Sequence, residues 1–243
     1  MSGLTVNIDL VAVLRSVRRL SEPDPAQAAV LAELAGADGI AVQVRRDRKY
    51  IRDRDLYILK GIVKTKLIVE MPPADELIDQ ALEIKPWMVI FAADHADSDS
   101  PVTTIDFNSA PVDFGDIVDR FRGVGINAGF YVEPESDDIK GASKAGAAAV
   151  LVNCKGFTEA RTVEDAQTEL DRIDKAVNSA SKQNLGVYCG RGVTYKNIQP
   201  LAELGYIDEF IIGHAIGSRA LLVGYERAVS EMLAAIRSTR QPG

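Results

Sequence analysis

Short apolar runs alternate along this chain with longer segments in which apolar residues recur every three or four positions. The short runs are rich in Val and Ile, which is typical of parallel strands buried on both faces. We expect strands at Thr5–Asp9, Gly39–Val44, Leu67–Glu70, Trp87–Ala92, Asn127–Val132, Ala148–Val152, Gly186–Gly190 and Phe210–Ile212. The longer segments predict helices at residues 24–36, 53–63, 74–84, 114–124, 136–145 and 163–183, with one more after each of the last two strands.

Strict alternation of strand and helix predicts an α/β protein with a parallel sheet. Eight repeats with no leftover segment favour closure into a (β/α)8 TIM barrel, and 243 residues is close to the usual barrel length of about 250. We therefore expect one domain over residues 1–243. The alternative is an open doubly wound sheet, which usually carries a glycine-rich phosphate turn after its first strand. The first turn here lacks that pattern.

Glycine turns follow the last two predicted strands. Gly213 and His214 come directly after Phe210–Ile212, and a helical pattern opens at Ser218. The preceding unit ends in Gly190, Arg191 and Gly192, and Thr194 is placed to cap the next helix. Glycine lets backbone approach a ligand, and free N–H groups at a helix start bind anions. Two such units late in a barrel predict phosphate binding, although the glycines could simply make tight turns.

Composition narrows the class of partner. The net charge of −7 and the absence of a clustered basic face argue against nucleic acid. No apolar run approaches the ~20 residues of a membrane span. The two cysteines are far apart in sequence, which indicates free thiols in a reducing cytoplasm. Spacing typical of zinc ligands is missing from the sequence, so we expect no metal site. These features predict a cytoplasmic protein whose partner is a small anionic molecule.

In a barrel the active site lies at the carboxyl ends of the strands. Polar residues at these positions include Asn7, Asp9, Gln43, Arg45, Glu70, Glu133, Asn153, Lys155, Arg191 and His214. The segment Ala93–Val112 is long and polar enough to act as a lid over this end.

Three of these positions allow catalytic and structural interpretations. Glu70 is either a general base or one half of a buried ion pair with Arg45 or Arg191. Lys155 could form a Schiff base if desolvated, but a solvated loop lysine is the simpler reading. His214 could bind phosphate, act as an acid or cap its turn. Cys154 and Cys189 are better read as small buried residues than as nucleophiles.

The chain resembles the pyridoxine 5′-phosphate synthase family. The resemblance rests on VNIDLVAVLRSVR, EPDPAQAAVLAELAGADGIAVQVRRDRKYIRDRD, IVEM, GRGVTYKNI and IIGHAI. It implies a barrel with extra helical segments, a homo-oligomer that is often an octamer, and no cofactor. It also implies condensation of 1-deoxyxylulose 5-phosphate with 3-amino-2-oxopropyl phosphate. The positions it assigns to substrate or catalysis are Asn7, Asp9, Arg18, Arg45, Glu70, Thr103, Gly192, Gly213 and His214.

Several acid–base positions depart from the family pattern. The resemblance implies histidines where this chain has Leu10, Gln43, Tyr50, Asn153 and Arg191, and a glutamate at Leu151. Gln cannot titrate and Arg stays protonated, so most of the proton shuttle is missing. Three hypotheses follow: a pyridoxine 5′-phosphate synthase-like enzyme that relies on Glu70, a diverged carbonyl enzyme using Glu70 with Lys155, Cys154 or Arg191, or a non-catalytic binding subunit.

Overall fold

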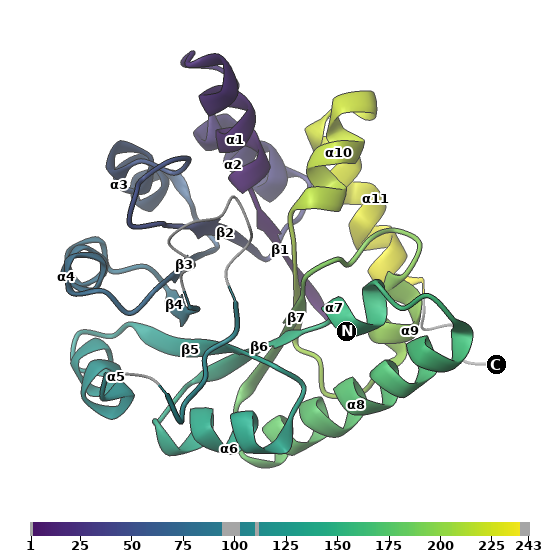
Figure 1. The fold of residues 1–243 in the computed structure, drawn as a ribbon. Coiled ribbons are helices and arrows are strands. Elements are labelled where there is room, and N and C mark those ends of the chain that lie inside the picture. The colour runs from purple at the N-terminus through teal and green to yellow at the C-terminus, as the bar shows by residue number, and fades with distance from the viewer. Residues whose placement is uncertain (1, 94–102, 110–111, 239–243) are drawn as a thin grey trace.

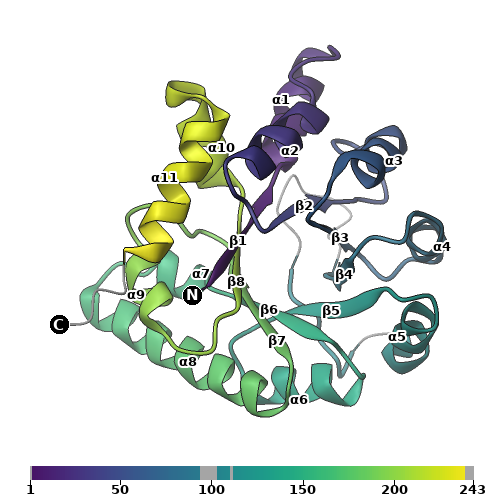
Figure 2. The ribbon, with the colours of Figure 1, turned by 180° about the vertical axis from the view of Figure 1, so that it is seen from behind.

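A computed structural model describes residues 2–93, 103–109 and 112–238. Eight parallel strands close into a barrel in sequence order, and β8 pairs back onto β1. Helices surround the barrel, as Figures 1 and 2 show from opposite ends. The predicted (β/α)8 barrel is thereby confirmed.

The strands are only a few residues long. They are β1 Gly3–Asn7, β2 Gly39–Gln43, β3 Lys66–Met71, β4 Met88–Phe91, β5 Asn127–Val132, β6 Ala149–Asn153, β7 Gly186–Gly190 and β8 Glu209–Ile212. The helices are α1 Asp9–Arg18, α2 Pro25–Leu34, α3 Asp53–Ile62, α4 Asp75–Ile84, α5 Phe114–Arg122, α6 Ser136–Lys144, α7 Lys155–Thr158, α8 Val163–Lys182, α9 Ile198–Glu203, α10 His214–Val223 and α11 Tyr225–Arg237. Within the part of the chain that the structure describes, no helix is both long enough and apolar enough to cross a membrane.

Two apolar cores follow from the two faces of the sheet. The larger core lies between strands and helices and includes Val42, Val69, Phe91 and Phe130. The smaller core fills the barrel interior and consists of Ala41, Ile68, Met88, Ile90, Ala92, Tyr131, Ala149, Leu151, Tyr188 and Ile211. Because the side chains of a strand alternate between its two faces, a residue two positions after one of these inward residues also faces inward, closer to the mouth of the barrel.

The structure corrects several predicted boundaries. The first strand ends at Asn7, and Asp9 begins helix α1, which the apolar pattern did not reveal. Helix α10 begins at His214 instead of Ser218. Helix α9 begins only at Ile198, and the Thr194 hydroxyl accepts a hydrogen bond from the Lys196 N–H in the turn before it. Only the unit after β8 therefore runs directly from strand through glycine into a helix.

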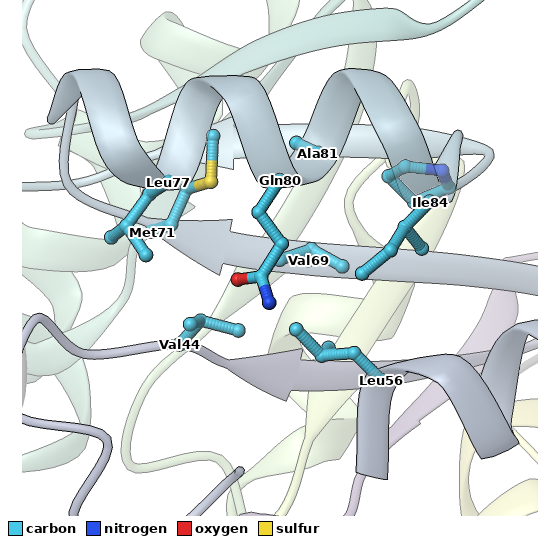
Figure 3. Close-up of a pocket in the computed structure, with 9 residues that line it drawn as sticks. Val44, Leu56, Val69, Met71, Leu77, Gln80, Ala81 and Ile84 are labelled. Carbon is cyan, nitrogen blue, oxygen red and sulfur yellow. The ribbon is translucent and has the colours of Figure 1, made fainter. Parts of the chain in front are cut away.

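Two hollows lie outside the barrel. One, of about 10 Å³, is enclosed between β2, β3, α3 and α4, where Figure 3 shows Gln80 pointing from α4 between Val44 and Leu56. It holds at most one water molecule and has an apolar lining. The other is an open groove of about 810 Å³ between α5 and α6. Neither hollow is lined by the inward-facing core residues of the strands, so both lie outside the barrel mouth where barrel chemistry is expected.

Candidate active site

Polar side chains occupy the last inward positions of neighbouring strands. Asn7 ends β1 and Gln43 ends β2, while Glu70 pairs in register with Gln43 on β3. Glu133 and Asn153 follow the inward Tyr131 and Leu151 by two residues. These residues come from five strands that converge at one end of the barrel. The structure therefore brings together several of the predicted site residues at the mouth.

Asp9 is fixed by three hydrogen bonds at the start of α1. Its Oδ2 accepts from Asn7 Nδ2 at 2.7 Å and its Oδ1 accepts from the Gln43 backbone N–H at 2.9 Å. Its own backbone N–H donates to Asn7 Oδ1 at 3.0 Å. The carboxyl group is thus held between β1 and β2 by neutral donors, with one hydrogen bond to each oxygen.

The Asp9 carboxyl titrates far from its ordinary range. Its pKa is raised from 3.8 to about 7, chiefly by burial and to a smaller extent by the charge of Glu70. The hydrogen bonds from Gln43 and Asn7 and the charge of Arg191 act in the opposite direction. The carboxyl therefore exchanges a proton near neutral pH.

Glu70 forms an ion pair with Arg191, one of the two partners expected from the sequence. Nη2 of Arg191 contacts Oε2 of Glu70, whose side chain is 0% exposed. The guanidinium carbon also lies 4.6 Å from the centre of the Tyr131 ring. Among the described residues, Glu70 Oε1 and Arg191 Nε have no hydrogen-bond partner. Glu70, Arg191 and Tyr131 thus form a polar layer over the apolar barrel interior, with donor and acceptor capacity left over.

Backbone approaches the site closely at the glycine turns. A Cβ at Gly213 would lie 2.8 Å from Asn7 Oδ1, and one at Gly190 would lie 2.8 Å from the Ile211 carbonyl oxygen. Arg191 and Gly192 both adopt positive φ angles, 75° and 71°. Gly213 caps α10, so the first N–H groups of that ten-residue helix have no partner within it. The helix start therefore has the free N–H groups that the predicted anion site requires.

Other predicted residues lie further from this cluster. Arg18 ends α1, about 14 Å along the helix from Asp9 at 1.5 Å per residue, and is exposed. The ammonium of Lys155 lies 3.8 Å from Glu159, and its side chain is 56% exposed. Arg18 therefore lies away from the mouth within a single chain. The Lys155 backbone N–H donates to Asn153 Oδ1, but its ammonium lies beside Glu159 and its side chain is largely exposed.

The remaining predicted residues have other surroundings. Arg45 pairs with Asp47 and is only 11% exposed. His214 is exposed, with Nε2 3.3 Å from the Ser218 hydroxyl. Thr103 exchanges two backbone hydrogen bonds with Ala93 at the end of β4. Most of the lid expected at Ala93–Val112, residues 94–102 and 110–111, lies outside the described residues.

Tyr131 is the site residue that the sequence argument missed, although period-two alternation along β5 would have placed it inward. Burial raises the pKa of its phenol, so the ring meets the guanidinium in its neutral form. Glu133, two residues later, accepts hydrogen bonds from Thr104 Oγ1 at 3.0 Å and Asn153 Nδ2 at 2.9 Å. Cys154 and Cys189 are free and fully buried in the outer core.

Comparison with known structures supports the fold. A thiamine phosphate pyrophosphorylase from Pyrococcus furiosus has a TM-score of 0.64 with 18% identity, covering 98% of this chain and 97% of that one. A KGPDC from Streptococcus mutans has a TM-score of 0.64 with 10% identity, covering 99% of this chain and all of that one. At such low identities, both similarities concern the barrel alone.

Sequence comparison adds the family. Residues 4–238 match the family model described as "Pyridoxal phosphate biosynthesis protein PdxJ". A pyridoxine 5′-phosphate synthase of Geobacter sulfurreducens is 41% identical over 96% of this chain and 98% of its own. One of Gloeothece citriformis is 41% identical over 98% of this chain and 99% of its own. The chain with this Asp9, Glu70 and Arg191 arrangement belongs to the PdxJ family of pyridoxine 5′-phosphate synthases.

Proposed function

We propose that this chain is a pyridoxine 5′-phosphate synthase-like enzyme that binds a phosphorylated carbonyl compound for condensation and ring closure. The observation that carries the proposal is that the start of α10, where we expect the phosphate to bind, lies next to the acidic and basic side chains of the mouth. Gly213 lies against Asn7, Asn7 holds Asp9, and Asp9 is within electrostatic reach of Glu70 and Arg191. A phosphate at the start of α10 would therefore hold the rest of its molecule near groups that move protons and stabilise negative charge.

The anion site can be tested without knowing the reaction. Calorimetric titration with inorganic phosphate and with 1-deoxyxylulose 5-phosphate should show binding of both to the wild-type chain. Gly213→Ala should weaken both by at least about tenfold, equivalent to about 1.4 kcal/mol, because its Cβ would press on Asn7 and crowd the helix start. Gly205→Ala is the matched control, since a Cβ there meets nothing within 4 Å. Equal affinities in the two variants would remove the α10 start from the site.

A second candidate function is a different carbonyl reaction on another anionic substrate. The pair between Glu70 and Arg191 favours it, because the family resemblance implies a histidine at position 191. An arginine does not accept protons near neutral pH, although it stabilises a developing oxyanion well. Under this second function, the Arg191–Glu70 pair stabilises charge on the substrate, and other groups transfer the protons. Rapid turnover of the two family substrates would exclude this second candidate.

We also propose that the chain forms a homo-oligomer. Large apolar side chains are exposed on α10, where Leu221 and Leu222 are 68% and 79% exposed, and on α2, where Leu34 is 72% exposed. Helix α1 contacts both α2 and α10, and Figures 1 and 2 show the three at one side of the barrel. Clustered exposed apolar side chains are typical of protein interfaces. Light scattering after gel filtration should give a mass that is a multiple of 26.3 kDa, and a monomer mass would refute this proposal.

A further inference from the structure

Asp9 differs from Glu70, another acidic residue at the mouth, in the charge of its partners. Glu70 is paired with a guanidinium and so is charge-compensated. Among the described residues, no cation forms an ion pair with Asp9, and its hydrogen bonds come from the neutral Asn7 amide and the Gln43 backbone. These two carboxyl groups of one site are thus placed in unlike environments, an arrangement by which enzymes give two carboxyl groups different roles.

We infer that Asp9 is the side chain that takes and returns the proton at this site, an inference that rests on the proposed function. The carboxyl group is oriented on both sides, and Asn7, which holds it, also touches the glycine that caps α10. A ligand with its phosphate at the α10 start would thus extend toward Asp9 over the Glu70–Arg191 pair. A general acid–base group works best when its pKa lies near the operating pH, and Asp9 meets that condition.

The step assigned to Asp9 is loss of water next to a carbonyl group. The C–H bond beside the carbonyl breaks, its proton forms an O–H bond on Asp9, and the electron pair moves toward the carbonyl oxygen. Asp9 then returns the proton to the hydroxyl oxygen on the next carbon, whose C–O bond breaks so that water leaves. The electron pair flows back from the carbonyl oxygen, which restores the carbonyl group and forms a C=C bond, so protons and electrons balance. The Arg191 guanidinium, whose Nε has no hydrogen-bond partner among the described residues, can share the negative charge on the carbonyl oxygen.

Each charged group or hydrogen-bond donor that acts on Asp9 shifts its pKa in a known direction. From β3 the Glu70 charge raises the Asp9 pKa, and after β7 the Arg191 charge lowers it. From α11 Tyr225 also faces it, but burial raises the pKa of that phenol, so it carries no charge near neutral pH. From β1 and β2 the Asn7 and Gln43 donors stabilise the charged form. Each neighbour can therefore be changed with a known direction of effect.

The first test measures the titration of Asp9 itself by NMR, on protein labelled with carboxyl-¹³C aspartate. We expect one aspartate signal with a midpoint at about pH 7, absent from Asp9→Asn. Asn7→Ala should move that midpoint upward, Glu70→Gln should move it downward, and Tyr225→Phe should leave it in place. A midpoint near the ordinary 3.8 would overturn the inference. Asp9→Asn can accept only one of the two hydrogen bonds that the Asp9 side chain accepts, so this variant could fail to fold. The midpoint measured in the wild-type chain tests the inference in either case.

The second test connects the titration to chemistry. Exchange of the carbon-bound hydrogens of 1-deoxyxylulose 5-phosphate in heavy water should be faster with the wild-type chain than with Asp9→Asn by about 10²-fold or more. Asp9→Asn should still bind inorganic phosphate. Equal exchange in the two proteins would overturn the role of Asp9 while leaving the proposed function in place. Failure of the wild-type chain to bind either phosphate compound would instead overturn the proposed function, whatever the Asp9 midpoint.

Discussion

Removing Arg191 should expose how strongly the mouth depends on its buried ion pair. Arg191→Met leaves the Glu70 carboxylate, 0% exposed, without its cation and with Oε1 already lacking a donor among the described residues. Breaking a buried pair by deleting one partner costs about 3–5 kcal/mol. The Arg191 side chain is 21% exposed, so water can reach part of the gap and we expect the lower end, about 3 kcal/mol. That is a large share of a typical unfolding free energy of about 5–15 kcal/mol.

The assay is urea unfolding of four proteins at neutral pH. They are the wild-type chain, Arg191→Met, Glu70→Gln and the double variant. Because the double variant leaves no buried charge behind, it should recover most of the loss, giving a coupling energy of a few kcal/mol.

Arg172 supplies a matched control for this prediction. It contacts Glu135 and Glu169, but its side chain is 40% exposed. Arg172→Met should therefore cost less than about 1 kcal/mol, as exposed pairs do. If Arg191→Met costs no more than Arg172→Met, and the effects of the two Glu70–Arg191 changes simply add, the reasoning about a buried, mutually dependent pair is refuted.

Two further predictions concern Asp9 and Lys155. Because the folded-state pKa of Asp9 is raised to about 7, the folded chain keeps a proton that the unfolded chain releases above pH 3.8. Its contribution to stability should be lost as the pH rises from about 4 to about 7, a fall that urea unfolding should find in the wild-type chain but not in Asp9→Asn. For Lys155, borohydride treatment with a phosphorylated ketone should leave the residue unmodified in mass spectrometry, since its ammonium is exposed and lies near Glu159. A trapped adduct on Lys155 would restore a Schiff-base mechanism.

The sequence was enough for the barrel because each buried strand reads as a short apolar run whose residues all face a core. Helix α1 was missed because Asp9 and Leu10 follow β1 without a turn signal and continue its apolar pattern. The start of α10 was placed late for a related reason, since small residues after Gly213 carry no helical period. The local sequence pattern does not show where the strand ends and the helix begins when the two are joined without an intervening turn.

Several residues of the candidate site could be predicted from the sequence, but most of the contacts between them could not. The position of Glu70 after an apolar run placed it at the mouth, and pairing with Arg191 was one of two stated alternatives. That Asp9 lies between donors of β1 and β2, and so titrates near neutral pH, depends on contacts across strands that no local pattern contains. The position of Arg18 at the end of α1 and the contact of the Lys155 ammonium with Glu159 also depend on the folded chain, and the roles predicted for both residues stay predictions.

The central claim is that Asp9 takes and returns the proton in this barrel, where the family resemblance implies histidines at positions such as Gln43 and Arg191. Its most direct test mixes the purified chain with 1-deoxyxylulose 5-phosphate and 3-amino-2-oxopropyl phosphate and measures pyridoxine 5′-phosphate, beside the Geobacter sulfurreducens relative. General acid–base groups each contribute about 10²–10⁴-fold, so we predict turnover lower than that of the relative by at least about 10²-fold, with the remainder lost in Asp9→Asn. Turnover equal to that of the relative, or unchanged in Asp9→Asn, would contradict the account.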